Sequence, residues 1–176
     1  MDSMINNEKI EIIRKFELPR YGEIPDVGLY LEQTCKYISG YLEPLGNISI
    51  TSTMISNYVK MGLVSNPVKK QYNREQIAYI MYIAVAKNVL SLEHIQLMLE
   101  LRKKSYDSEV AYEYFRLEFK NVLQYVFGIK DELEAVGVDN TSEKTMLRNT
   151  IITVAHKVYL DMCFSMLEEI VTEKKD

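Results

Sequence analysis

The chain has 176 residues, of which 47% are hydrophobic, and this is enough apolar material for one substantial core. Its formal net charge of -4 excludes a polycation that coats nucleic acid, so any nucleic-acid function must lie in a local patch. The two cysteines, Cys35 and Cys163, are far apart, which fits a reducing cytosol better than a zinc site or a disulfide framework.

The N-terminal part of the chain predicts two helices. Residues 1–25 mix charges of both signs without a continuous apolar segment, which excludes a secretory signal peptide and indicates a helical extension. Asp26, which follows Pro25, is expected to cap a helix over 26–42, because the apolar positions of that stretch recur close to helical spacing.

A short helix and a hairpin are expected next. Thr51 or Ser52 caps a helix that ends at about Met61, and Gly62 supplies its left-handed stop. The stretch LVSNPVKKQY then contains β-branched residues, an Asn-Pro turn and no helical period. This pattern predicts a tight hairpin or loop.

Two further helices follow in quick succession. Asn73 and Gln76 form a capping box for a helix that continues to Lys87 through the apolar run 77–86. That run is about half of the roughly 20 residues that span a bilayer, so we expect a helix buried in protein and no membrane partner. A helix over 5–16 is a candidate to cover it. Ser91 is expected to cap the next helix, LEHIQLMLELRKK.

The remaining residues predict a separate C-terminal helical unit. Asp107 or the following serine starts a helix rich in tyrosine and phenylalanine that ends at Gly128. Asn140 and Glu143 form a second capping box. The last helix has apolar residues at intervals of four and three, which is typical of a helix-helix seam within one chain or between two: Leu147, Ile151, Val154, Val158 and Met162.

The stretch from Pro44 to Arg74 contains no acidic residue, although the chain carries 25 of them. An even spread would put roughly 4 there, so the deficit indicates a surface that meets negative charge. A helix that enters the major groove of DNA needs short polar side chains and a positive N-terminal end. The predicted DNA-binding residues are Thr51, Ser52, Thr53, Ser56, Asn57, Lys60, Lys69, Lys70 and Arg74.

These residues have different expected roles. Asn57 is the best candidate for a bidentate contact to adenine, whereas Lys69, Lys70 and Arg74 would neutralise phosphates. Serine and threonine before a helix usually act as caps, so Thr51 and Ser52 have that alternative role. Tyr58 and Tyr72 are expected to pack the hairpin against the helix rather than to stack on bases.

The segment TSTMISNYVKMGLV, followed by KKQYNREQIAYIMYIAVAKNVLSLEHIQLML, resembles the winged helix-turn-helix DNA-binding domain of MerR-type bacterial transcription regulators. Tyr58 before MGLV, Tyr72 before a capped helix, and LSLEHIQLML carry the resemblance, which covers about residues 48–101. Ser56 and Val59 depart from the pattern, which usually has an arginine and an acid there. The whole chain looks closer still to the bacterial family called domain of unknown function 1836, a name that implies no activity.

These patterns predict a mainly α-helical, cytoplasmic protein in three parts: an N-terminal extension over 1–25, a MerR-like winged helix-turn-helix over 26–104, and a dimerisation or effector unit over 105–176. The resemblance implies a sequence-specific transcriptional regulator that binds double-stranded DNA as a homodimer through the 51–61 helix and the 65–72 wing. The alternative is a non-catalytic protein-interaction module on a winged-helix scaffold that has lost DNA binding. Ser56 in place of arginine favours that alternative.

The sequence gives little support for catalysis, and we expect no enzyme activity, cofactor or metal. His94 and His156 are far apart, and Cys163 lies two helical turns from His156, beyond hydrogen-bond reach. These residues lack the further ligands of a usual metal site. Thirteen tyrosines, several in the 108–128 helix, are expected to pack in the core, with a pocket for a small-molecule effector as the alternative.

Overall fold

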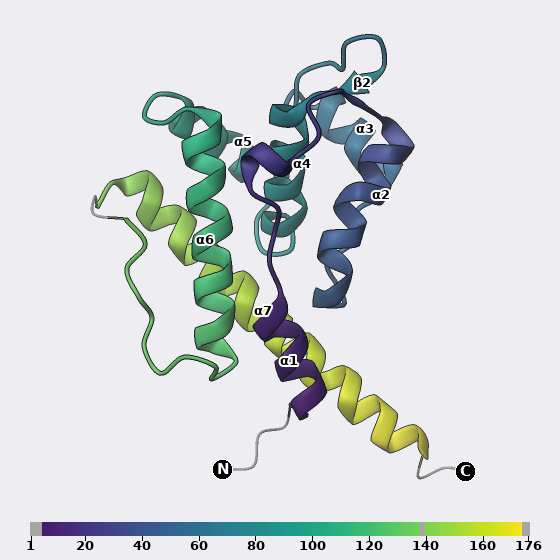
Figure 1. Cartoon of the computed structure of the whole chain (residues 1–176), viewed down its shortest axis with the longest axis vertical. Coiled ribbons are helices and arrows are strands. Elements are labelled where there is room, and N and C mark those ends of the chain that lie inside the picture. Colours follow the sequence, from purple (N-terminus) through teal and green to yellow (C-terminus); the bar gives the residue numbers. More distant parts are fainter. Residues whose placement is uncertain (1–4, 138–139, 174–176) are drawn as a thin grey trace.

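The structure is a computed structural model that describes residues 5–137 and 140–173. Within these ranges the chain is mainly α-helical, as predicted, with one small antiparallel sheet (Figure 1). The helices are α1 (Asn7–Lys15), α2 (Leu31–Leu42), α3 (Ser52–Lys60), α4 (Arg74–Ala86), α5 (Leu92–Lys103), α6 (Ser108–Val126) and α7 (Ser142–Glu173). The strands are β1 (Leu29–Tyr30) and β2 (Gln71–Tyr72), and the 3-10 helices are η1 (Tyr21–Glu23) and η2 (Glu43–Leu45).

Side-chain caps set the starts of the central helices where the sequence predicts them. The Thr51 hydroxyl accepts a hydrogen bond from the Met54 amide at 3.2 Å. Asn73 and Gln76 form both bonds of the predicted capping box, at 2.9 and 2.8 Å. Ser91 caps α5 with a single bond, in which its hydroxyl accepts from the His94 amide. Gly62 has the left-handed φ of 78° that ends α3. Hydrogen bonds between residues close in the sequence therefore set where these helices begin.

The helix expected over 26–42 is shorter than predicted, because its first residues form a strand. Gly28 has a φ of 79°, which a helix does not allow, and the chain then pairs Leu29 with Tyr72 and the next residue with Gln71. Tyr30 is the N-cap of α2. Asp26 is therefore not the cap; its carboxylate lies 3.8 Å from the Arg74 guanidinium instead.

The apolar helix α4 is buried on all sides by other helices. It packs against α2, α5, α6 and α7, and all of Ile77, Ile80 and Ile83 are buried. The expectation that the 5–16 helix covers α4 is wrong, because α1 packs mainly against α6 and η2. A helix that is apolar all round requires several partners, and the C-terminal helices provide them.

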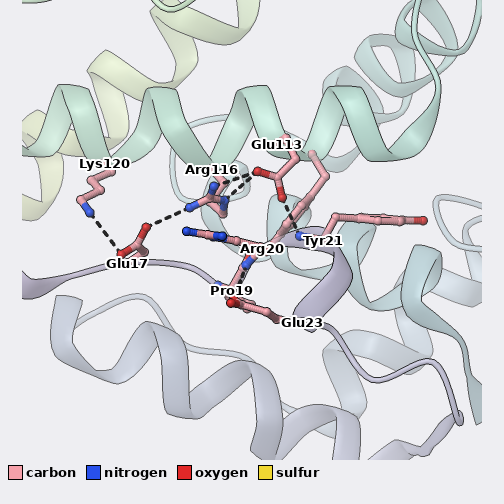
Figure 2. A network of polar contacts seen from close by, with 9 residues as sticks. Glu17, Pro19, Arg20, Tyr21, Glu23, Glu113, Arg116 and Lys120 are labelled. Carbon is pink, nitrogen blue, oxygen red and sulfur yellow. Dashed lines mark hydrogen bonds and ion pairs between the residues drawn. The ribbon is translucent and has the colours of Figure 1, made fainter.

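An N-terminal arm, residues 16–28, connects α1 to β1 and is held against α6 by polar contacts (Figure 2). The buried Arg116 guanidinium pairs with Glu113 at 2.8 Å and with Glu17 at 3.0 Å. The Tyr21 amide donates to the Glu113 carboxylate at 2.6 Å, and the Tyr112 hydroxyl donates to the carbonyl of the arm's Pro19 at 2.9 Å. These bonds satisfy groups that burial would otherwise leave unpaired.

The long helix α7 has one face inside the protein. Its predicted seam residues Ile151, Val154, Val158 and Met162 are buried within the chain, so this seam is intramolecular. Its cap is Thr141, whose hydroxyl accepts from the Lys144 amide at 3.3 Å, one residue later than the predicted box. One hydrophobic cluster runs from Ile5 to Cys163, and it includes buried residues of α6 and α7 together with buried residues of the preceding helices.

A second apolar stripe on the C-terminal half of α7 is exposed to solvent. The residues are spaced by four, three and four positions, and Phe164 is 61% exposed. The stripe consists of Leu160, Phe164, Leu167 and Val171. By length and composition, α7 is the one helix in the described ranges that is able to cross a bilayer; 39% of its most apolar window is buried in the protein. Core helices of soluble proteins meet the same criterion.

Candidate nucleic-acid interface

Helix α3 separates an apolar face from a polar one. Ile55 and Tyr58 are buried and anchor the helix to the core. The opposite face is exposed and consists of residues at helical spacing, namely Thr53, Ser56, Asn57 and Lys60. Four of the predicted DNA-binding residues are therefore brought together on one accessible face.

The other polar residues at the start of α3 are less available to a ligand. The Thr51 hydroxyl is engaged in the cap, and Ser52 is partly buried. Tyr58 is a packing residue as expected, and burial raises the pKa of its phenol to about 12. Its hydroxyl has no hydrogen-bond partner among the described residues. Tyr58 thus serves the core and is turned away from the exposed face.

The predicted hairpin has a two-residue tip formed by lysines. The Gln71 amide donates to the Val68 carbonyl at 2.9 Å, which closes the turn. Lys69 and Lys70 have φ angles of 50° and 64°, and both side chains are exposed. A turn with positive φ at both central positions matches the twist of a hairpin but normally selects asparagine or glycine.

Arg74 holds the N-terminal arm. Its Nε donates to the Ile24 carbonyl at 2.9 Å, a second nitrogen donates to the Gly22 carbonyl at 3.4 Å, and the guanidinium lies 5.8 Å from the ring centroid of Tyr21. Together with the nearby Asp26 carboxylate, these intramolecular partners engage much of the Arg74 guanidinium. Arg74 therefore has a structural role that the sequence did not indicate.

The start of α3 has an unusual charge environment. Six of the seven described helices carry a glutamate in the first turn, whereas α3 carries no acid there. The positive end of its helix dipole is thus left without a compensating carboxylate. Across residues 5–137 and 140–173, Lys60, Lys69 and Lys70 have no ion-pair partner.

Sequence reasoning missed a further cation beside α3. The Lys87 ammonium lies 2.9 Å from the Met54 sulfur, in the first turn of α3, and burial lowers the pKa of this lysine. These two residues are far apart in the chain, so no local pattern signals their contact. Lys87 adds positive charge at the end of α3 that already lacks acids.

Helix α3 and the hairpin with the lysine tip lie at the same end of the molecule (Figure 1). The polar face of α3 offers hydrogen-bond donors and acceptors, and the hairpin offers two exposed cations. This combination suits a ligand that has a regular row of negative charges and polar groups between them. In the described part of the chain, no group of three or more histidine, cysteine or acidic side chains is placed to hold a metal ion.

Comparison with known proteins identifies a family. The sequence profile of a domain of unknown function, DUF1836, matches residues 19–115, which is more than half of the chain. The match begins in the N-terminal arm, covers α2 to α5 and the hairpin, and ends within α6. No curated protein and no solved structure matches the sequence. The chain belongs to the DUF1836 family.

Proposed function

We propose that this protein is a sequence-specific, DNA-binding transcription regulator. In this proposal α2 and α3 form a helix-turn-helix of MerR type, with α3 as the recognition helix and the 65–72 hairpin as the wing. The order of α2, α3, hairpin, α4 and α5 supports this reading, as does the pairing of β2 with a strand before α2. A cytoplasmic location is part of the same proposal.

The observation that carries the proposal is the polar face of α3 without carboxylates, on a helix at the same end of the molecule as the exposed Lys69–Lys70 tip. In this proposal the exposed Asn57 reads a base edge, and the short, exposed side chains of Ser56 and Thr53 lie close to the groove floor. The N-terminus of α3, which has no acidic residue in its first turn, and Lys87 favour a phosphate at the start of this helix. Arg74 is not included among these phosphate contacts, because its guanidinium donates to the N-terminal arm.

We further propose that two copies associate through the exposed stripe of α7. Leu160, Phe164, Leu167 and Val171 repeat at intervals of four, three and four, the spacing of a coiled-coil seam. The stripe faces away from the core of its own chain, so a second copy is able to cover it. A symmetric dimer would present two recognition helices to a pseudo-palindromic site.

The test is fluorescence anisotropy with random-sequence duplex DNA over a series of salt concentrations. We expect the native protein to bind with a strongly salt-dependent affinity, because lysine contacts release counterions from the phosphates. The double variant Lys69→Glu, Lys70→Glu is expected to lose roughly 100-fold in affinity at low salt.

The matched control is the double variant Arg14→Glu, Lys15→Glu. These are adjacent, exposed basic residues on α1, which lies at the opposite end of the molecule from the hairpin (Figure 1). The control makes the same change in net charge, so we expect it to weaken binding only slightly. Equal losses in the two double variants would mean that net charge, and not the hairpin, determines the affinity.

A second candidate function is a protein-interaction module on the same scaffold. Val68 is 73% exposed beside the two lysines, and an apolar side chain at a hairpin tip suits a protein partner. Ser56, where MerR-type regulators usually have arginine, points the same way. Negligible DNA binding at every salt concentration by the native protein would favour this module over the regulator.

A further inference from the structure

A cavity of about 330 Å³ lies between α4, α5, α6 and α7. Its walls come from both sides of a junction: α4 and α5 belong to the segment proposed to bind DNA, and α6 and α7 follow that segment. Cavities of this size accommodate small organic molecules. The tyrosines of α6 contribute to it, so the pocket suggested by their number lies at the junction and not inside the C-terminal helices alone.

The interior of the cavity is apolar. Tyr82 from α4, Met98 from α5 and Phe115 from α6 form its wall, and Leu147 closes it from α7. The rings of Tyr82 and Phe115 meet edge to face at 5.4 Å between centroids, which fixes the aromatic side. Leu117, also in the wall, is 44% exposed, so the apolar surface continues to the mouth. A hydrocarbon or aryl group suits this interior.

The wall also contains two cations, and both lie on tyrosine rings. The Arg102 guanidinium lies 4.9 Å from the ring centroid of Tyr79, and it donates to the Tyr106 carbonyl at 3.0 Å and to the Tyr79 hydroxyl. The Lys144 ammonium lies 4.6 Å from the ring centroid of Tyr114. A guanidinium has five N–H donors in a planar fork that matches a carboxylate, so these contacts leave Arg102 donors for a ligand.

One carboxylate, Glu143, is present among the described lining residues, and it accepts a hydrogen bond from the Ser105 hydroxyl at 2.8 Å. Glu75 lies just outside the wall, where its carboxylate contacts the Ser108 hydroxyl. Both carboxylates thus have protein donors of their own. The aromatic rings that would attract a cationic ligand already carry Arg102 and Lys144, so a second cation would meet repulsion.

We propose that this cavity binds an apolar monocarboxylate, aliphatic or aryl, with its hydrocarbon part among Tyr82, Met98 and Phe115 and its carboxylate facing Arg102. The recognition combines an apolar body with one charged end, which a bidentate guanidinium contact orients. The site spans the junction between two pairs of helices, so an occupied cavity joins α4 and α5 to α6 and α7 through a shared ligand.

The test is isothermal titration calorimetry of the full chain with decanoate, decanol and decylammonium, each below its micellar concentration. These probes share one hydrocarbon chain and differ in the charge of the head group. We expect decanoate to bind with a Kd on the order of 100 µM and the other two at least roughly tenfold more weakly. Equal affinity for decanol or decylammonium would overturn the assignment of a carboxylate.

Variants locate the site. Ala111→Leu adds bulk to the wall from α6 and is expected to abolish decanoate binding, whereas Ala135→Leu, on an exposed loop residue outside the wall, is expected to leave it unchanged. Arg102→Gln should weaken decanoate roughly tenfold and leave decanol unchanged, with Lys144→Gln as a second charge variant should the first fail to fold. Unaltered binding by Ala111→Leu, or no binding by the native protein, would overturn the proposal. No DNA is present, so this outcome is independent of the proposed regulator function.

Discussion

At the scale of single residues, the lysines at the hairpin tip hold a backbone conformation that their side chains disfavour. Lys69 and Lys70 have positive φ angles where asparagine and glycine are the usual choices. A left-handed non-glycine residue costs about 1 kcal/mol. The sequence thus keeps two exposed cations at a position where uncharged residues would give a more stable turn.

We predict opposite effects of Lys70→Gly on stability and on DNA binding. The free energy of unfolding should rise by roughly 0.5–1 kcal/mol, because relief of the left-handed strain exceeds the entropy that glycine adds to the unfolded chain. The DNA affinity should fall because one phosphate contact is lost. Urea denaturation and anisotropy measure the two effects. Lys70→Arg, which keeps both the charge and the strain, should change neither property.

Glu118 is a second residue whose surroundings oppose its preferred state. This carboxyl on α6 is fully buried, and its nearest cation is Arg148 at 3.1 Å. Neither carboxylate oxygen has a well-aligned hydrogen bond among the described residues. Burial raises the pKa of Glu118 above its value in the unfolded chain, against the opposing effect of Arg148. Its favourable contribution to stability is therefore complete below the unfolded pKa and is lost as the pH rises through the folded pKa.

Glu118→Gln should remove this dependence. At a pH of about 7 we expect the variant to be more stable than the native protein by about 1 kcal/mol, and the difference should disappear towards a pH of about 4. Thermal unfolding followed by circular dichroism across this range measures it. Glu134→Gln, at an exposed carboxyl that pairs with Lys130 at 3.2 Å, is the control and should show a much smaller effect. A stability difference that does not vary with pH would contradict the assignment.

At the scale of elements, α7 combines two apolar stripes with different partners. The first, which includes Ile151 and Val158, packs inside the chain, and the second, which includes Phe164 and Leu167, is exposed. The spacing of the first stripe led to the expectation of a seam but left open which chain supplies the other side. The first stripe is buried within its own chain, so that chain supplies the other side of the seam. The proposed dimer contact is therefore assigned to the second, exposed stripe.

The double variant Phe164→Lys, Leu167→Lys should prevent self-association. Lysine at these positions places like charges against each other across the proposed dimer seam, and both side chains are exposed in the single chain. Sedimentation equilibrium should give a dimer for the native protein and a monomer for the variant. Met146→Lys, at an exposed apolar residue 14 positions before the stripe and near the start of the same helix, is the control and should remain dimeric. A native protein that is monomeric at all concentrations would remove the seam from the proposal.

The sequence predicted those elements whose signals are local. The capping residues Thr51, Asn73 and Ser91 act within three residues, so their pattern is sufficient. Strand β1 was missed because two residues are too short to show alternation, and its partner Tyr72 is far along the chain. The tether made by Arg74 and the cation at Lys87 were missed for the same reason, since each depends on a contact between distant segments.

At the scale of the whole molecule, the segment that matches the family profile shares its hydrophobic core with residues that lie after the match. The match ends at residue 115, within α6, yet Phe119 and Val122 further along the same helix are buried. They belong to the cluster that also contains Ile151 and Val154 of α7. Residues of the C-terminal helices therefore pack in the same hydrophobic cluster as residues of the family segment.

The N-terminal arm connects α6 to the β1–β2 ladder. One end is fixed to α6 through Glu113 and Arg116, and the other continues into β1, which pairs with the strand that follows the lysine tip. Between them, Arg74 clamps the carbonyl of Ile24 to the start of α4. A rotation of α6 against α4 must therefore either break these hydrogen bonds and ion pairs or move the β1–β2 ladder as well. The position of the hairpin would then depend, through the arm, on the position of α6.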